Sequence, residues 1–329
     1  MADDQKMEKG RVCVTGGTGF VASWLIMKLL QHGYSVNATV RSHPSGSKKD
    51  PSFLTSLPGA QDRLQIFPAD LNDPGSFGPA IEGCVGLFHV AHPMDAGDEE
   101  TATNKSVGAL LGILQACVDS KTIKKVVYTS SAVTVAMKDR GGDEAQLDEG
   151  SWSEVNFMRN MTAFGVSYCI SKTMTEKAAL EFATNHGLDL ATVIPPWIHG
   201  PFICPNMPFS VKKMLGLIIG NEPSVNYART SAIVHVDDIA EAHIYLFEHR
   251  EANGRYICSA VEATDRELVE LVSSRYPEFK LVNPKILSDP ADNSRFSSKK
   301  LLETGFTFKH GLEEMFDDAI RCCKNKGLL

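Results

Sequence analysis

This chain of 329 residues contains no apolar run of the roughly 18–20 residues that a membrane-spanning helix requires. Its N-terminal sequence, MADDQKMEKG, lacks the hydrophobic segment of a secretory signal. The net charge of −7 leaves no basic surplus to attract nucleic acid. We therefore expect a cytoplasmic protein that binds neither membranes nor nucleic acid.

The chain also lacks CxxC pairs and clusters of cysteine with histidine, so nothing in it indicates a zinc site. Its eight cysteines are scattered, and the one close pair, Cys322 and Cys323, is adjacent. Free thiols in a reducing compartment are the simplest interpretation, and we expect no metal. The sequence has no internal repeat, and its 43% hydrophobic and 22% charged residues are typical of a globular protein.

The first informative motif of the sequence is Arg11–Leu30, where a short apolar strand, a glycine-rich turn and a helical pattern follow one another. The turn is Gly16-x-x-Gly19-x-x-Ala22, a variant of the dinucleotide-binding fingerprint. A helix N-terminus offers unpaired N–H groups and partial positive charge, and glycine lets a pyrophosphate approach the backbone. The stretch therefore predicts a dinucleotide site, with an ordinary strand–helix turn as the alternative.

A second predicted strand, Tyr34–Val40, ends at Arg41. An acidic residue at this point of a Rossmann unit binds the ribose 2′-hydroxyl, whereas arginine suits a 2′-phosphate. No carboxylate follows Arg41 until Asp50. We therefore expect NADP(H) rather than NAD as the cofactor, and the alternative is a solvated arginine at the end of a strand.

Strands alternate with helices, among them Val107–Ser120, over the first ~190 residues, which predicts an α/β protein with an NAD(P)-binding Rossmann fold and a doubly wound parallel sheet. Beyond a strand at Thr192–Ile194, closely spaced prolines interrupt regular structure, as expected of a segment that encloses a substrate. We predict an NADP-binding Rossmann domain at residues 1–195, to which residues 230–258 return. The remainder, residues 196–329, is expected to form a smaller, mostly helical substrate-binding region.

The clearest chemical signal is the sequence YCISK, from Tyr168 to Lys172. Residues four apart on a helix share a face, so the phenol would lie beside the ammonium group. An unperturbed tyrosine titrates near ~10, and a neighbouring cation is expected to lower that pKa towards the working range. The spacing alone is typical of a surface pair. Its place after a strand that ends in Thr129-Ser130-Ser131, whose hydroxyls can polarise a carbonyl, favours catalysis instead.

These features together resemble the extended short-chain dehydrogenase/reductase superfamily, through TGGTGFVA at 15–22, Asp70-Leu71, TSS at 129–131 and YCISK at 168–172. Within it, the chain is similar to the plant dihydroflavonol reductase, vestitone reductase and cinnamoyl-CoA reductase family. The resemblance runs nearly end to end, from GRVCVTGGTGF at the N-terminus to MFDDAIRCCKNKG at the C-terminus. It is nearest to the vestitone reductases, and noscapine synthase comes second.

The resemblance implies a catalytic set of Ser131, Tyr168 and Lys172. Tyr168 would protonate the substrate oxygen, Lys172 would lower the pKa of that phenol and hold the nicotinamide ribose, and Ser131 would hydrogen-bond the oxygen. The residues implied or expected at the cofactor are Gly16, Gly19, Phe20, Val21, Arg41, Asp70, Leu71, Ala91, Tyr168, Lys172 and Pro195. For Asp70 two interpretations stay open: a hydrogen bond to the adenine amino group, or a cap on the next turn.

Departures from the family pattern concern the substrate. Ala136 stands where dihydroflavonol reductases carry asparagine, and the residues around Tyr168 differ from those of cinnamoyl-CoA reductases, which argues against both specific activities. His92 replaces a serine or threonine and His199 an aliphatic residue, and each is either structural or in contact with the ligand. Substrate contacts are expected from His92, Met94, Ala136, Phe164, Trp197, Phe202 and Met207, with Phe157, Met161 and Met214 as further apolar lining.

The sequence thus predicts an NADPH-dependent ketone reductase of plant specialised metabolism that acts on an aromatic isoflavonoid, flavonoid or alkaloid. An NAD(P)⁺-dependent dehydrogenase of an alkaloid alcohol or hemiacetal, as in noscapine synthase, is the alternative, because the same residues serve both directions. A non-enzymatic NADP-sensing protein and a nucleotide-sugar epimerase or dehydratase are more remote alternatives. We expect a monomer or weak homodimer whose partner is a small aromatic molecule.

Overall fold

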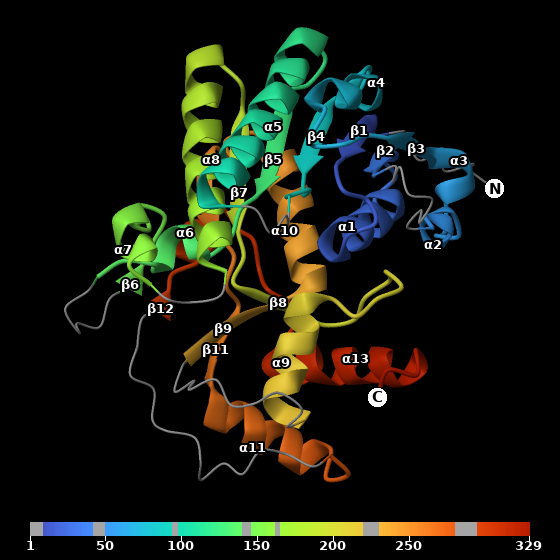
Figure 1. Ribbon diagram of the computed structural model, residues 1–329. Helices are drawn as coiled ribbons and strands as arrows, with labels where there is room; N and C mark the ends of the chain where they lie inside the picture. Colours follow the sequence, from blue (N-terminus) through green and yellow to red (C-terminus); the bar gives the residue numbers. More distant parts are fainter. Residues whose placement is uncertain are drawn as a thin grey trace.

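The computed structural model describes residues 9–41, 50–93, 98–139, 146–161, 165–219, 230–279 and 295–329 (Figure 1). Its strands are β1 (Arg11–Val14), β2 (Ser35–Val40), β3 (Leu64–Pro68), β4 (Gly86–His89), β5 (Lys125–Thr129), β6 (Gln146–Leu147), β7 (Leu190–Ile194), β8 (Trp197–His199), β9 (Thr230–His235), β10 (Gly254–Ile257), β11 (Val261–Thr264) and β12 (Arg295–Phe296). Its helices are α1 (Phe20–Gln31), α2 (Ser52–Thr55), α3 (Ala60–Arg63), the 3₁₀ helix η1 (Pro74–Phe77), α4 (Gly78–Ile81), α5 (Glu99–Ser120), α6 (Val133–Ala136), α7 (Val155–Arg159), α8 (Val166–His186), α9 (Phe209–Ile219), α10 (Val236–Glu248), α11 (Asp265–Arg275), α12 (Lys299–Glu303) and α13 (Leu312–Asn325).

Seven strands form one sheet in the order β10-β7-β5-β4-β1-β2-β3, and every pairing in it is parallel. The chain adds β2 and β3 on one side of β1, and β4, β5, β7 and β10 on the other side, so the direction of strand addition reverses between β1 and β4. Open parallel sheets bind ligands beyond the carboxyl ends of the strands at such a switch point. The glycine turn follows β1 directly, so the fold places it at this position. The predicted doubly wound parallel sheet is confirmed.

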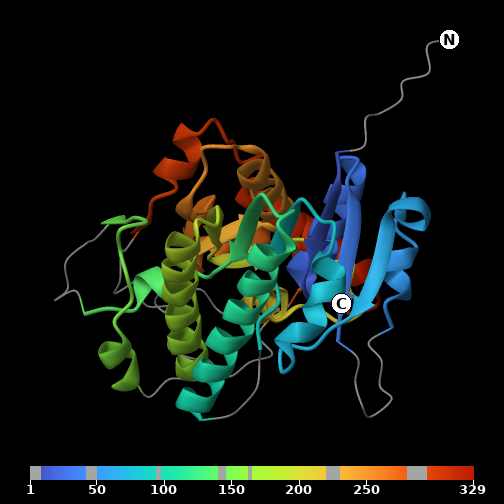
Figure 2. The same cartoon turned by 90° about the horizontal axis from the view of Figure 1, so that it is seen from above.

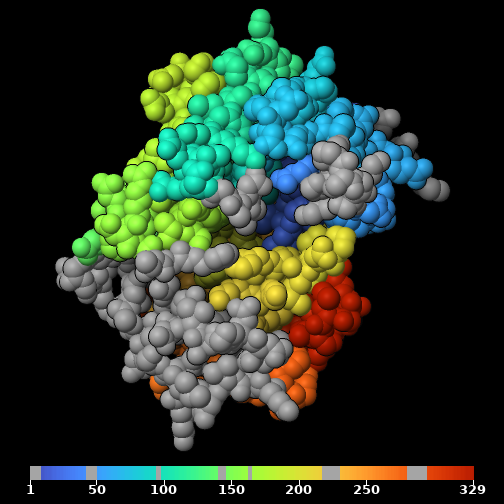
Figure 3. Space-filling view, viewed as in Figure 1, coloured from blue at the N-terminus to red at the C-terminus, as the bar shows by residue number. Residues whose placement is uncertain are grey.

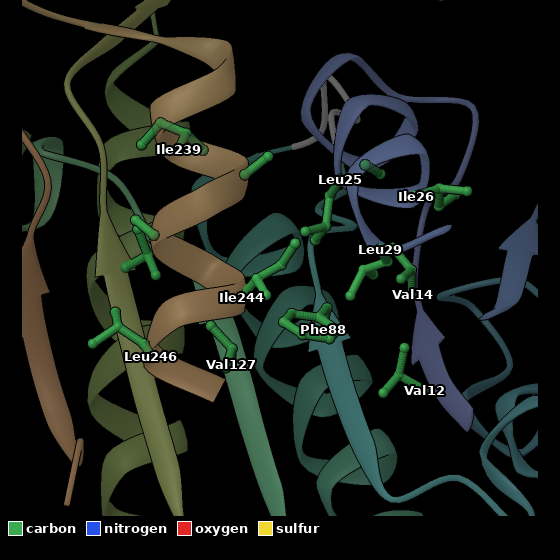
Figure 4. Close-up of a cluster of buried hydrophobic side chains, with 14 of the residues drawn as sticks. Val12, Val14, Leu25, Ile26, Leu29, Phe88, Val127, Ile239, Ile244 and Leu246 are labelled. Carbon is green, nitrogen blue, oxygen red and sulfur yellow. The ribbon is translucent and has the colours of Figure 1, made fainter. Parts of the chain in front are cut away.

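The sheet has a hydrophobic core on each face, because successive side chains of a strand point to opposite sides. In β1, Val12 and Val14 pack with α1 and α10 (Figure 4), whereas Cys13 packs with α5 and α8. The helices α5 and α8 lie side by side on their face of the sheet (Figure 2). Strands buried on both faces are rich in apolar residues, which explains why the sequence pattern identified them, although β2, β4 and β5 also bury Asn37, His89 and Lys125.

Of residues 230–258, which the sequence assigns to the Rossmann domain, α10 and β10 return to the large sheet, whereas β9 belongs to a smaller sheet. The helix α10 packs against α1, and β10 adds a parallel strand beside β7. Lys125 in β5 is buried, and its Nζ donates to the carbonyl oxygens of His249 at 2.7 Å and Ala252 at 3.0 Å. A lysine in this position satisfies carbonyl groups at and just beyond the C-terminus of α10. The proposed boundary between the two domains nevertheless stays a prediction.

The C-terminal region lies beyond one end of the large sheet (Figure 1). A three-stranded sheet, β11-β9-β8, packs with α9, α11 and α13 around a core that includes Ile233, Met315 and Phe316. The mostly helical region that the sequence predicts thus also contains a small sheet, of which β8 and β11 do not follow from the sequence pattern. Its strands have three to six residues, too few to show a clear alternation in the sequence.

The helix expected at Val107–Ser120 begins earlier, at Glu99. Residues 99–106 (EETATNKS) are polar and carry no apolar stripe, so periodicity alone did not indicate a helix there. The start is instead fixed by Asp98, whose side chain accepts a hydrogen bond from the Thr101 N–H at 2.9 Å. The connection between β4 and α5 is therefore shorter than the sequence suggested.

Candidate active site

The glycine turn has the geometry of an anion site. Gly16 adopts a φ of +73°, and a Cβ there would lie 3.1 Å from Ala91, so a larger residue would be strained and crowded. Gly19 is the N-cap of α1, where no side chain caps the helix and no acidic residue occupies the first turn. The first N–H groups of α1 are thus available to a negatively charged group. In the space-filling view this N-terminal segment (blue) reaches the surface between the cyan-to-green part of the chain and the yellow segment around α9 (Figure 3).

Thr15 ties the ends of β1 and β4 together. Its Oγ1 accepts hydrogen bonds from the N–H groups of Val90 at 3.0 Å and Ala91 at 3.1 Å, and it lies 3.0 Å from Nδ1 of His89. Since both lone pairs of the hydroxyl are occupied, its one hydrogen is donated to Nδ1. Burial, with a smaller contribution from Lys172, lowers the pKa of His89 to about 3. His89 is therefore neutral, with its proton on Nε2. The hydrogen bond from the Ala91 N–H to Thr15 Oγ1 holds the Ala91 backbone against the glycine turn.

The predicted catalytic residues come together at the start of α8. Tyr168 and Lys172 lie one turn apart on this helix, and Ser131 follows β5 and hydrogen-bonds the Tyr168 phenol. Lys172 is buried, and its Nζ donates to the Thr129 carbonyl oxygen at 2.9 Å. The same Nζ lies 5.1 Å from the centre of the Tyr128 ring. The carboxyl end of β5 and the first turns of α8 thus form one cluster of a hydroxyl, a phenol and an amine.

Burial controls the protonation of this cluster. It raises the pKa of Tyr168 to about 12, although the hydrogen bond with Ser131 opposes the shift. Burial also lowers the pKa of Lys172 to about 7, although the negative charge of Glu176 raises that pKa and so opposes the shift. The direction of the Tyr168 pKa shift is opposite to the one expected from the sequence, because desolvation of the phenolate outweighs the hydrogen bond with Ser131. At neutral pH the phenol is therefore protonated and able to donate its proton.

His92 lies directly beside the catalytic phenol. Its ring centre is 5.4 Å from that of Tyr168, and the two planes are nearly perpendicular, at 86°. Nε2 of His92 is buried and has no hydrogen-bond partner among the residues that the structure describes. Burial, followed by the charge of Lys172, holds the pKa of His92 well below its ordinary value, so the ring is neutral. His199, in contrast, is buried against Phe316 of α13, with ring centres 4.5 Å apart.

Several predicted cofactor residues can be placed from their contacts. Pro195 is buried, and its carbonyl accepts a hydrogen bond from Ala132 at 2.8 Å, which puts it beside the Ser131 turn. Oδ1 of Asp70 accepts from the Asn72 N–H at 2.8 Å, so the turn-capping interpretation is observed, while a contact with adenine stays a prediction. Leu71 is buried in the core on the α5 side of the sheet.

The ends of β2 and α1 hold three more of these residues. Arg41 is exposed directly after β2. Phe20 and Val21 open α1 immediately after the glycine turn, and both are partly exposed. The positions agree with the roles expected of them at the 2′-phosphate and the pyrophosphate, which remain predictions.

The predicted substrate residues divide into three groups. Met94 and Phe164 lie outside the described residues. Trp197, in β8, is 38% exposed, Met207 is partly buried, and Ala136 ends the short helix α6 after the Ser131 turn. Phe157 and Met161 are partly buried in and after α7. Phe202 and Met214 are packed inside the C-terminal core.

Phe202 is therefore a packing residue rather than an open wall of a pocket, contrary to the sequence prediction. It is 3% exposed, and its backbone N–H lies 3.4 Å from Sγ of Cys322 in α13. Lys326 covers its ring, with Nζ 5.3 Å from the ring centre. A helix that follows Phe202 by more than a hundred residues thus encloses it, which no local pattern could reveal.

Residues 12–259 match the model of the NAD dependent epimerase/dehydratase family. The chain belongs to this family. It is 48% identical over 326 residues to vestitone reductase from Medicago sativa, which covers 98% of this chain and 99% of that protein. It is 47% identical to noscapine synthase SDR1 from Papaver somniferum, over 97% of this chain and 93% of that protein. The expected resemblance is confirmed, and with it the assignment to the short-chain dehydrogenase/reductase enzymes.

Solved structures of this family have the same fold. Vestitone reductase from alfalfa, whose crystal structure is known, is 47% identical to this chain. The two structures match with a TM-score of 0.87, and the match covers 98% of this chain and 100% of the vestitone reductase chain. Gre2 from Candida albicans, in a complex with NADPH, is 25% identical and matches with a TM-score of 0.81, over 96% of this chain and 99% of that one. The Rossmann fold of the enzyme is thereby confirmed.

The described part of the chain contains neither a membrane-spanning helix nor a cluster of metal-ligating side chains. No helix there is both long and apolar enough to cross a membrane. Nor does that part bring together three or more histidine, cysteine, aspartate or glutamate side chains in an arrangement that could hold a metal ion.

Proposed function

We propose that the enzyme is an NADPH-dependent carbonyl reductase of plant specialised metabolism, acting on a ketone of an aromatic isoflavonoid, flavonoid or alkaloid. One observation carries the proposal: a protonated Tyr168 phenol that shares a hydrogen bond with Ser131 and lies one helical turn from the buried Lys172. This arrangement provides both a proton donor and a hydroxyl for a carbonyl oxygen. The names of the relatives, vestitone reductase and noscapine synthase, support the substrate class.

The glycine turn fits the cofactor. Gly16 and Gly19 leave the approach to the uncapped start of α1 free of side chains, and Arg41 stands exposed at the end of β2. We assign the pyrophosphate to the turn with Phe20 and Val21, and the 2′-phosphate to Arg41. When bound, NADPH supplies the hydride that reduces the carbonyl carbon.

The enzyme's own groups then act on the substrate oxygen. Ser131 donates a hydrogen bond that orients and polarises the carbonyl, and Tyr168 transfers its phenolic proton to the oxygen as negative charge develops there. Lys172 stabilises the phenolate that remains, provided its amine is protonated. Pro195, beside the Ser131 turn, and Ala91, against Gly16, are placed to line the cofactor side of this space.

The protonation state of Tyr168 suits reduction, which begins with the phenol, whereas oxidation begins with a phenolate that accepts the proton of the alcohol. Burial raises the pKa of Tyr168 to about 12, so the phenol predominates at neutral pH. The same residues serve both directions, so the direction is assigned by assay.

The substrate side is assigned to His92, Ala136, Trp197 and Met207, together with Met94 and Phe164. Neutral His92 can offer a hydrogen bond to the substrate from a position against the Tyr168 ring. We further propose that the enzyme works in the cytoplasm as a monomer or weak homodimer. All eight cysteines are free thiols, which fits a reducing compartment.

The proposed function is tested by assaying the purified enzyme in both directions with each cofactor. The panel contains isoflavanone, flavanonol and alkaloid ketones with NADPH or NADH, and the corresponding alcohols with NADP⁺ or NAD⁺. We expect turnover of at least one ketone at neutral pH, a preference for NADPH, and alcohol oxidation that increases only as the pH rises and the phenol loses its proton. Turnover confined to alcohol oxidation at neutral pH would favour the dehydrogenase alternative. Tight binding of NADP⁺ without any turnover would favour the sensor.

A further inference from the structure

Behind the catalytic residues lies a buried carboxylate that the proposed reaction does not use. Glu176 is fully buried on α8, one turn beyond Lys172. Its Oε2 accepts hydrogen bonds from Ser130 Oγ at 2.7 Å and from Arg255 Nη2 at 3.4 Å. Its Oε1 accepts from Thr192 Oγ1 at 2.7 Å and from Arg255 Nε at 3.1 Å. Four donors thus surround the carboxylate, which lets it remain charged in the interior.

Arg255, the ion-pair partner of this carboxylate, is also held by several contacts. Arg255 lies on β10, and its Nη1 donates to the carbonyl oxygens of Glu149 at 2.8 Å and Ser151 at 2.6 Å. Its Nη2 donates to Thr134 Oγ1 at 3.1 Å. The guanidinium carbon lies 3.6 Å from the centre of the Trp152 ring, a stacked cation–π contact. The guanidinium therefore joins β10 to residues 149–152 and to α6, the helix that follows the Ser131 turn.

These contacts reach each part of the catalytic cluster. Ser130, which Glu176 holds, directly precedes Ser131 in the chain. Thr192, held by the other oxygen, lies on β7, which leads to Pro195. The carboxylate itself projects from the helix that carries Tyr168 and Lys172. One ion pair thus connects the hydroxyl turn, the catalytic helix and the strand that leads to the expected nicotinamide site.

We propose that Glu176, paired with Arg255, is a positioning residue of the reaction: it fixes the Ser130–Ser131 turn against α8 and places a negative charge one turn from Lys172. The inference rests on the proposed function in so far as Lys172 serves in the reaction. The pair itself touches none of the reacting atoms.

The charge of Glu176 matters because the other ionisable groups facing Lys172 are neutral. Those groups are Tyr168 on the same helix, Tyr128 on β5, His89 on β4 and His92 just beyond it. Both tyrosines have a raised pKa and both histidines a lowered pKa, so none of them carries charge at neutral pH. Glu176 is the counter-charge that opposes the desolvation of the Lys172 amine.

The test compares Glu176→Gln with the wild-type full-length enzyme. Glutamine keeps the size and most hydrogen bonds but removes the charge. We expect the pKa of Lys172, followed by NMR of ¹⁵N-labelled lysine side chains, to fall by about one unit. The alkaline limb of kcat for ketone reduction should move to lower pH by the same amount. Because a pKa near 7 leaves about half of the amine charged at pH 7, kcat there should fall about fivefold.

Three further variants make the result specific. Glu181→Gln changes an exposed carboxylate on the same helix and should leave both readouts unchanged. Glu176→Asp keeps the charge and should keep the Lys172 pKa near wild type even where kcat drops. If Glu176→Gln does not fold, the double variant Glu176→Met with Arg255→Met removes the whole pair, a replacement that proteins often tolerate. It should show a smaller downward pKa shift, because the positive charge of Arg255 is lost together with the carboxylate.

An unchanged Lys172 pKa in a folded variant without the carboxylate would overturn the proposal. So would full wild-type kcat with an unmoved alkaline limb in that variant. The NMR readout needs no turnover, so it decides the inference even if the wild-type enzyme reduces none of the ketones and the proposed function fails.

Discussion

Replacing Tyr168 by phenylalanine lowers kcat for ketone reduction by about 10²–10⁴-fold, the usual contribution of a positioned proton donor. The change removes only the phenolic oxygen and keeps the ring on which His92 packs. Binding of NADPH should therefore stay close to that of wild type. Single-turnover kinetics and a fluorescence titration of NADPH separate the two effects.

Tyr128→Phe is the matched control. That phenol is also buried near Lys172, but its hydroxyl has no hydrogen-bond partner within the described part of the chain. Its removal should leave kcat near the wild-type value. Equal activity of wild type and Tyr168→Phe would mean that the proton comes from another group, for which Ser131 and His92 are candidates.

Replacing Lys172 by methionine is expected to lower kcat by about 10²–10³-fold, because the phenolate left by proton transfer loses its stabilising charge. Methionine occupies a similar apolar volume in a position where lysine is only 3% exposed. Glu176 keeps its ion pair with Arg255, so the fold should persist. NADPH should also bind more weakly, since Lys172 is assigned to the nicotinamide ribose.

Lys177→Met provides the control for this variant. Lys177 lies on the same helix but is exposed, with Nζ 5.0 Å from the centre of the Trp152 ring. Its replacement should change neither kcat nor NADPH affinity. Retention of wild-type kcat by Lys172→Met would show that the amine has no part in the chemistry.

The parts of the fold that the sequence predicted are those fixed by local physics. The apolar strands, the glycine turn and the helical spacing of Tyr168 and Lys172 depend on residues close together in the chain. The carboxyl-end rule for parallel sheets then brings Ser131, after β5, into the same region. The doubly wound sheet and the composition of the catalytic cluster followed from these rules.

The parts that could not be predicted depend on contacts distant in sequence. Phe202 belongs to the core because α13 covers it, and Glu176 remains charged because Arg255, 79 positions later, pairs with it. The protonation of Tyr168 depends on how deeply the phenol is buried, which the spacing of tyrosine and lysine does not express. His89 offered a weak signal, as the one polar residue in the apolar run VGLFHV, and its link to Thr15 required the packed structure.

In the proposed reaction, this site reduces a carbonyl group with hydride from NADPH and a proton from Tyr168. The most direct measurement follows NADPH that carries deuterium at C4 during turnover of a ketone from the panel. We predict a product with one deuterium on the new carbinol carbon, formed from only one face of the nicotinamide, and no such product from Tyr168→Phe beyond its residual rate. A reduced product without deuterium at that carbon from both the 4R-labelled and the 4S-labelled NADPH would contradict the proposed reaction.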